Sequence, residues 1–202
     1  DNTGIFGENN FRITIQNNVF NMPANPSVKV FGVYLKNSNT EGVESLPEEN
    51  EPAPAYRMFL INNTFNNGTA SMMLLNYTSS YIPFYVKGNI CNSASSVGIV
   101  GRNLTGTFKD NIFSNTGSLS PMGIHLIASS PDLYNNTIIS EEVSLHTIGS
   151  SYPNLKPIVS GSNLSWTGGK NRFTSIQSDN IQLANIGSAY TNLGENRFSV
   201  DT

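Results

Sequence analysis

Two histidines have the types and spacing that most directly suggest chemistry. His125 lies in "GIHLI" (123–127) and His146 in the similar stretch "VSLHTI" (143–148). If these stretches are adjacent strands in register, the two imidazoles stack about 5 Å apart and could bind a metal ion or act as a base. No carboxylate is clearly placed to complete either arrangement. We therefore interpret them as two exposed histidines on neighbouring strands, and we expect no metal site and no cofactor.

Other side chains capable of catalysis are few. The aspartates are Asp1, Asp110, Asp132, Asp179 and Asp201. Asp110 and Asp132 occupy different positions of the repeat described below, so we do not expect them to face each other as a catalytic pair. The single cysteine, Cys91, excludes an internal disulfide and stands in an apolar column of the same repeat. It is predicted to be a small core residue, and we assign no catalytic residue.

The composition limits the possible partners. The chain has 202 residues, of which 38% are hydrophobic, and this predicts one domain over 1–202 with a continuous core. Only 12% of residues are charged and the net charge is −3, so the chain lacks the Lys and Arg that a nucleic-acid surface needs. No apolar run reaches the roughly 18 residues needed to cross a bilayer. We expect neither a nucleic-acid partner nor a membrane span.

The elements that position these residues come from a repeated phrase in which an asparagine stands two residues before an apolar residue. These asparagines are Asn18, Asn63, Asn89, Asn111, Asn136, Asn171 and Asn196. The residues two positions later are Phe20, Phe65, Cys91, Phe113, Ile138, Phe173 and Phe198. Most spacings between the asparagines are 22 to 26 residues, and the two longer ones contain the insertions 37–55 and 149–162. The chain is therefore an interrupted repeat.

The physics of one repeat predicts strands separated by corners. Apolar residues at alternate positions before each asparagine indicate a strand with one inward face. The last of these apolar residues and the apolar residue after the asparagine are separated by an odd number of positions. Both can point inward only if the chain bends between them. Asparagine tolerates the left-handed conformation better than other non-glycine residues. We expect the repeated asparagine itself to take that conformation, and its amide to bond to the equivalent asparagines of adjacent repeats as a ladder.

Each repeat also contains a second alternating stretch, such as "GIHLI" or "MMLL" (72–75), and shows no helical periodicity. About three short strands per repeat cannot bury an inward face alone, so successive repeats must stack. We predict an all-β fold, a parallel β-helix of about six to seven coils of 22–26 residues. A β-sandwich also has short, regularly spaced strands, but it would not repeat one asparagine phrase in register.

The phrases "LYNNTIIS" (133–140), "INNTFNNG" (61–68) and "PMGIHL" (121–126) resemble the right-handed parallel β-helix repeat family, over about residues 11 to 200. The resemblance implies a single-stranded right-handed solenoid with an internal asparagine ladder. Members of that family include pectate lyases, polygalacturonases, phage tailspikes and bacterial adhesins, most of them secreted or on the cell surface. The "NTD", "DD" and "GHG" phrases of polygalacturonases do not occur here. The repeat predicts a fold and only biases the function.

One outward face of the predicted solenoid is unusually apolar and basic. Positions four and two residues before the corner include Phe59, Tyr85, Lys87, Lys109, Asp132 and Tyr134. Three hypotheses follow: the aromatic rings and lysines bind an acidic sugar chain, the glutamate-rich insertion 37–55 covers them, or another protein does. The glutamates of that insertion lack the spacing of a calcium loop.

The leading functional hypothesis is a non-catalytic scaffold, secreted or on the cell surface, that presents loops and this face for adhesion, assembly or glycan contact. The alternative is a polysaccharide lyase or glycoside hydrolase that acts on an acidic polysaccharide at the same face. Possible partners are a polysaccharide or another surface protein. We also expect further domains or chains at the two ends of the solenoid, since "DNTGIFGENN" and "ENRFSVDT" do not resemble caps.

Overall fold

The computed structural model describes residues 2–9, 13–24, 27–37, 58–77, 82–93, 97–115, 122–140, 143–149, 171–175, 181–186 and 197–200. These residues form β-strands joined by turns, with no helix among them. The strands make three sheets, here named A, B and C, in which every pair of neighbours is parallel.

The strands of each sheet follow one another in sequence order. Sheet A contains β1 (Asn2–Glu8), β4 (Val30–Asn37), β7 (Ala70–Asn76), β10 (Val97–Arg102), β13 (Met122–Ile127), β16 (Val143–Ile148) and β18 (Ile181–Ile186). Sheet B contains β2 (Ile13–Gln16), β5 (Met58–Ile61), β8 (Ile82–Lys87), β11 (Leu104–Lys109) and β14 (Asp132–Tyr134). Sheet C contains β3 (Val19–Asn21), β6 (Thr64–Asn66), β9 (Ile90–Ser93), β12 (Ile112–Asn115), β15 (Thr137–Ser140), β17 (Arg172–Ser175) and β19 (Arg197–Val200).

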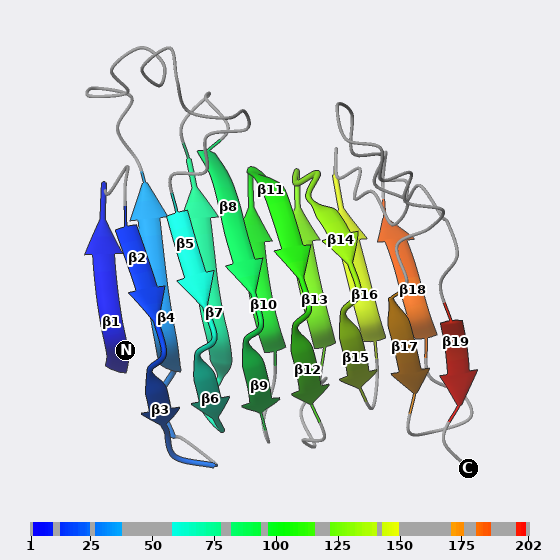
Figure 1. Cartoon of the computed structure of the whole chain (residues 1–202), viewed down its shortest axis with the longest axis horizontal. Helices are drawn as coiled ribbons and strands as arrows, with labels where there is room; N and C mark the ends of the chain where they lie inside the picture. Colours follow the sequence, from blue (N-terminus) through cyan, green and yellow to red (C-terminus); the bar gives the residue numbers. More distant parts are fainter. Residues whose placement is uncertain are drawn as a thin grey trace.

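From β1 to β15 the chain visits sheets A, B and C in turn, and each new strand pairs with the strand of the previous round (Figure 1). We call one such round a coil. The coils succeed one another along the long axis of the molecule (Figure 1). This confirms the predicted all-β class, and the stacked parallel sheets are consistent with a β-helix.

The core lies between the sheets and consists of rows of equivalent residues, one from each coil. The row in sheet C is Phe20, Phe65, Cys91, Phe113, Ile138 and Phe173. All of these from Phe65 onward are 0% exposed, and the rings of Phe20 and Phe65 stack with centroids 4.7 Å apart. Each buried side chain of this size contributes about 1.5–3 kcal/mol relative to an exposed one. Stacking of coils, rather than any single coil, therefore provides the burial.

The predicted asparagine ladder is present from Asn18 to Asn171. At each step the side-chain Nδ2 of one asparagine donates to Oδ1 of the next, over 2.9–3.1 Å. The backbone N–H of each asparagine donates to the same oxygen. Because most of these amides are fully buried, the ladder satisfies polar groups that would otherwise destabilise the core. Asn196 lies outside the described residues.

The prediction that the ladder asparagine itself is left-handed was wrong. The residue just before it has positive φ instead: Asn17 (57°), Asn62 (51°), Gly88 (65°), Asp110 (57°) and Asn135 (50°). Bending the chain one residue earlier lets that residue point outward while the ladder asparagine turns its amide into the core. The three asparagines in this column are exposed, in contrast to the ladder asparagines from Asn63 to Asn171, which are buried.

The insertions 37–55 and 149–162 lie outside the described residues apart from their first residues. Asn37 is buried as the last residue of β4, and Gly149 follows β16 with φ of 68°. In the described part of the chain, no helix is long and apolar enough to cross a membrane.

Candidate binding face on sheet B

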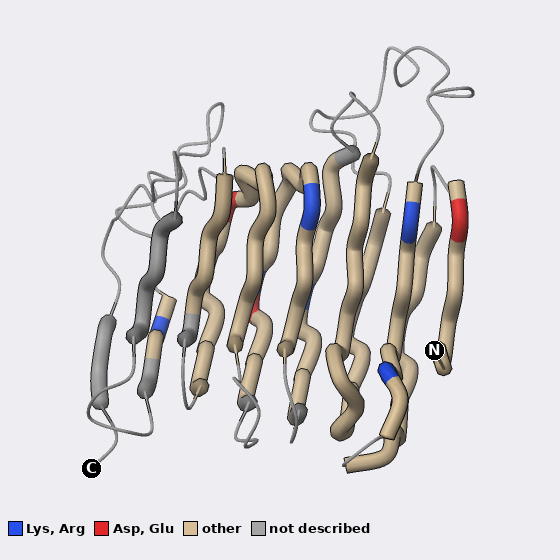
Figure 2. Tube along the Cα trace, turned by 180° about the vertical axis from the view of Figure 1, so that it is seen from behind, with Lys and Arg blue, Asp and Glu red and all other residues tan. Residues whose placement is uncertain are grey.

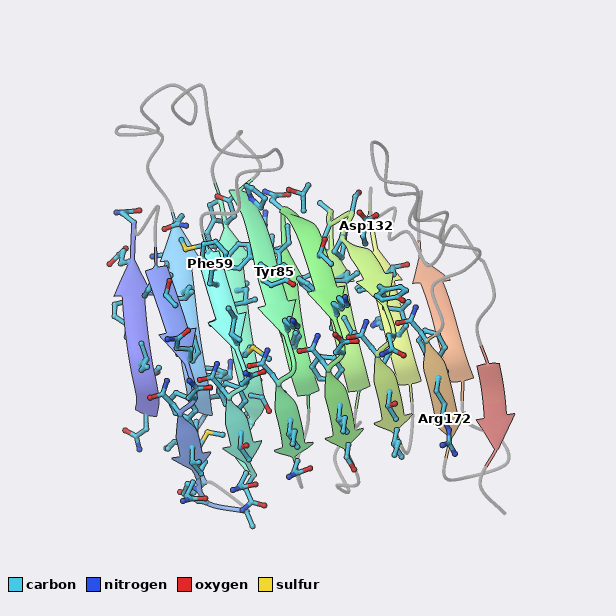
Figure 3. The ribbon with its side chains drawn as sticks, in the orientation of Figure 1. Phe59, Tyr85, Asp132 and Arg172 are labelled. Atoms are coloured by element: carbon cyan, nitrogen blue, oxygen red, sulfur yellow. The ribbon has the colours of Figure 1, made fainter. Side chains whose placement is uncertain are left out.

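The strands of sheet B bring all six predicted face residues onto one outer surface. We call these residues the sheet B face: Phe59, Tyr85, Lys87, Lys109, Asp132 and Tyr134. They point away from the core because they alternate along β5, β8, β11 and β14 with fully buried residues. Figure 3 shows Phe59, Tyr85 and Asp132 along the near side of the molecule. Each of the six is partly buried by its neighbours.

The first outward column of this face is aromatic at one end and acidic at the other. Phe59 pairs in register with Tyr85, and their rings meet edge to face with centroids 6.2 Å apart. Thr107 follows Tyr85, and Asp132 follows Thr107. The two aromatic rings are therefore adjacent, whereas Asp132 is separated from them by a coil.

The second outward column carries the basic residues. Lys87 pairs in register with Lys109, and Lys109 with Tyr134. The Lys109 ammonium lies 5.2 Å from the centroid of the Tyr134 ring, a cation–π distance. Burial, followed by the charge of Asp110, raises the pKa of Tyr134. The tyrosine is therefore a neutral hydrogen-bonding and stacking group at physiological pH.

The structure adds Asp110 to this face. Its carboxylate lies 3.9 Å from the Lys109 ammonium and accepts a 2.7 Å hydrogen bond from Nδ2 of Asn135. In the sequence, Asp110 is marked by its position directly before a ladder asparagine. Residues at that position have positive φ and are directed outward. Asp110 and Asp132 are not register partners, as expected, since Asp132 pairs with Thr107. The described residues contain no group of three or more His, Cys, Asp or Glu that could hold a metal ion.

The two histidines stack on the outer face of sheet A. His125 and His146 are register partners, and their ring centroids are 4.7 Å apart with planes tilted by 52°. The predicted stacking is confirmed. Their interpretation as exposed was wrong, because both are partly buried by neighbours such as Val100. Burial, followed by the charge of His146, lowers the pKa of His125, which is therefore a neutral imidazole at physiological pH.

Two outward features were missed in the sequence. The outward columns of sheet A around the histidines are mostly apolar, although they also contain Lys36 and Arg102; the other members are Tyr34, Met73, Leu75, Val100, Ile127 and Ile148. On sheet C, Asn21, Asn66 and Asn92 form a second, exposed ladder with bonds of 2.8 and 3.3 Å. In the sequence, this second ladder is indicated by an asparagine that stands three positions after each of the first three ladder asparagines.

Cys91 is confirmed as a core residue. Its side chain is 0% exposed, and burial raises the pKa of its thiol to about 12, an effect that the neighbouring Ser71 side chain offsets only in part. A thiol with this pKa is not a nucleophile at physiological pH.

Charged residues are sparse on the described strands, and on the side seen in Figure 2 they do not gather into one stripe. The sheet B face carries Lys87 and Lys109 in adjacent positions of one column, together with Asp110 and Asp132. Comparisons with protein-family models, with curated proteins and with solved structures found no match to this chain.

Proposed function

We propose that this chain is a non-catalytic scaffold, a right-handed single-stranded parallel β-helix of about six to seven coils, that presents the sheet B face to an acidic polysaccharide. The order in which the strands visit the three sheets and the asparagine ladder support the solenoid. The resemblance of the repeat phrases to secreted β-helix proteins supports a location outside the cell or on its surface.

The observation that carries the proposal is an aromatic pair in one outward column of sheet B beside a lysine pair in the next outward column. The edge-to-face pair of Phe59 and Tyr85 offers apolar ring surface to the faces of sugar rings. Lys87, two residues after Tyr85 in the same strand, and its register partner Lys109 supply ammonium groups that attract carboxylate or sulfate groups. Parallel strands lie about 4.8 Å apart, so successive coils repeat at a spacing comparable with one sugar residue.

The same face is poorly equipped for hydrolysis or elimination. Retaining and inverting glycosidases need two carboxyl groups on either side of one bond. Asp132 and Asp110 are not register partners, and Asp110 is engaged by Lys109 and Asn135. We therefore assign the face to binding and give it no role in bond cleavage.

A panel of acidic and neutral polysaccharides tests this function, with binding and product formation measured on the same samples in the presence of Ca²⁺. We expect binding of acidic polymers, weakened by salt, without new reducing ends or unsaturated products. The double variant Lys87→Gln/Lys109→Gln should lose this binding, whereas Lys36→Gln on sheet A should retain it. Cleavage that depends on Lys87 or Lys109 would establish the enzyme instead. Binding that is unchanged in the double variant would remove the face from the function.

A further inference from the structure

The outer surface of sheet A carries two neighbouring columns of mostly apolar side chains. The central column runs from Met73 through Val100 to the two histidines, and each step is a register pair. The next column contains Leu75, Ile127 and Ile148. We call these five apolar residues and the histidine pair the sheet A face. All seven side chains are partly exposed, and contiguous apolar surface of this kind marks an interaction site.

The outward columns of the other two sheets are interrupted by polar or charged side chains. Sheet B carries Lys87, Lys109 and Asp132. On sheet C the exposed Ile90 stands two residues before Asn92 of the exposed asparagine ladder. Sheet A lies behind sheet B in Figure 1. A rod with one apolar side can bury that side against a single neighbour, as an amphipathic helix does, and leave the sheet B face in contact with solvent.

The charged residues of sheet A lie along one border of this face. Lys36 and Arg102 occupy the column beside the histidines, near the C-terminal ends of their strands. Lys36 pairs with Glu8 at 3.3 Å, and the Arg102 guanidinium lies 4.7 Å from the centroid of the Tyr77 ring. From β4 to β16 the central column contains no charged side chain apart from the two histidines. An apolar centre with a polar border is the arrangement of protein–protein interfaces.

Sheet A is large enough for a stable contact. Its seven strands have six to eight residues each. With about 4.8 Å between strands and about 3.3 Å per residue, the sheet covers about 700 Å². Two copies that meet at this surface would together bury about 1,400 Å², which lies within the roughly 1,200–2,000 Å² of specific, stable interfaces.

We propose that the sheet A face docks the same face of a second copy of this chain, so that two copies pack side by side in a closed dimer. A second copy presents an apolar surface of the same length, width and charged border, and no like charges oppose each other at the centre while the histidines are neutral. A contact that uses one surface on both partners closes on itself, so association stops at the dimer. The proposal goes beyond binding at the sheet B face, which stays exposed on both copies.

Sedimentation velocity of the 202-residue chain at pH 8, over a wide range of concentration, tests the proposal. We expect only monomer and dimer, with a dimer that persists at high salt, because salt screens charges and the centre of this contact is apolar. A chain that stays monomeric at every concentration, or a series that continues beyond the dimer, overturns the proposal.

Two matched lysine variants locate the contact. Val100→Lys adds an ammonium group that a monomer can extend into water but a dimer must bury, so the dimer dissociation constant should rise about 100-fold or more. Ile112→Lys makes the same kind of change at an exposed apolar residue of sheet C and should dimerise like the wild type. Circular dichroism establishes that each is folded, and Met73→Lys in the same column repeats the test if Val100→Lys is not. A folded Val100→Lys or Met73→Lys protein that dimerises like the wild type overturns the proposal.

Two further measurements separate this contact from other uses of the molecule. The Lys87→Gln/Lys109→Gln variant of the sheet B face should dimerise like the wild type, and loss of the dimer in that variant would place the contact on sheet B and overturn the proposal. Flotation with uncharged phosphatidylcholine vesicles tests a lipid surface as the occupant. A monomer that floats with these vesicles, and no longer does so as Val100→Lys, would assign the sheet A face to lipid and overturn the proposal.

Discussion

At the scale of single residues, the ladder asparagines contribute most through the buried groups that they satisfy. Asn111 accepts from both the backbone N–H and Nδ2 of Asn89 at 3.0 Å, and its own Nδ2 donates to the Val86 carbonyl at 2.8 Å. Removing this side chain leaves donors and an acceptor without partners inside the core. That cost exceeds the net value of any one hydrogen bond, because unpaired buried groups lose their hydration without compensation.

We therefore predict that Asn111→Ala lowers the free energy of unfolding by about 2–4 kcal/mol. The matched control is Asn92→Ala in the exposed ladder, where water replaces the lost partner and the change should stay within about 0.5 kcal/mol. Chemical denaturation of both variants measures the difference. Equal and small effects would mean that the internal ladder does not stabilise the fold.

The stacked histidines predict a pH dependence of stability. The pKa of His125 is lowered in the folded state, so below its ordinary value of about 6.5 the unfolded chain binds this proton more readily. Stability is then unaffected by His125 above about pH 6.5 and falls as the pH drops through the folded pKa. His146→Gln removes the neighbouring charge and should make the fall shallower, as followed by thermal unfolding at a series of pH values. An identical pH profile in the variant would show that the pair is not coupled.

At the scale of elements, β11 contains a glycine that the repeat pattern alone did not explain. Gly106 has φ of 100°, and a Cβ there would overlap the backbone of Phe84, its register partner in β8. The position belongs to a column, five residues before each repeated asparagine, that is apolar in most other repeats, and the sequence showed only that this column was irregular. Close approach of two strands depends on the backbone path, which residue types alone do not determine.

Gly106→Ala should therefore destabilise the protein by on the order of 3 kcal/mol, through both the positive φ and the overlap. Gly149→Ala is the control: its φ of 68° is also positive, but apart from its chain neighbours no atom of the described residues lies within 4 Å of its added Cβ. We expect about 1 kcal/mol there, the cost of the backbone conformation alone. Thermal unfolding compares the two, and equal losses would contradict the steric part of the argument.

The location of corners and faces shows how much of the fold and of the candidate site follows from sequence. Alternation and the asparagine phrase predicted the inward rows, the ladder and all six residues of the sheet B face, because register repeats from coil to coil. The bend was assigned to Asn63 and its equivalents, whereas residues such as Asn62 take the left-handed conformation. When two asparagines are adjacent, residue type cannot identify which one turns inward. The role of Asp110 was missed because the bend was assigned to Asn111, whereas Asp110 takes the left-handed conformation.

At the scale of the whole molecule, the ladder and the rows connect all three sheets into one stack. No coil can bury its inward face without its neighbours, as the partly buried Ile5, Ile13 and Phe20 at the end show. Interior coils should therefore open only with the stack as a unit, while the N-terminal coil opens more readily.

Native-state amide hydrogen exchange of the ladder tests this central claim most directly. The backbone N–H groups of Asn63, Asn89, Asn111 and Asn136 donate to buried oxygens of the next coil, so we predict that they exchange with the free energy of global unfolding. The N–H of the exposed Asn18 should exchange faster. If the four interior amides exchanged as fast as that of Asn18, the ladder would not hold the coils together, and the rigid scaffold proposed here would be contradicted.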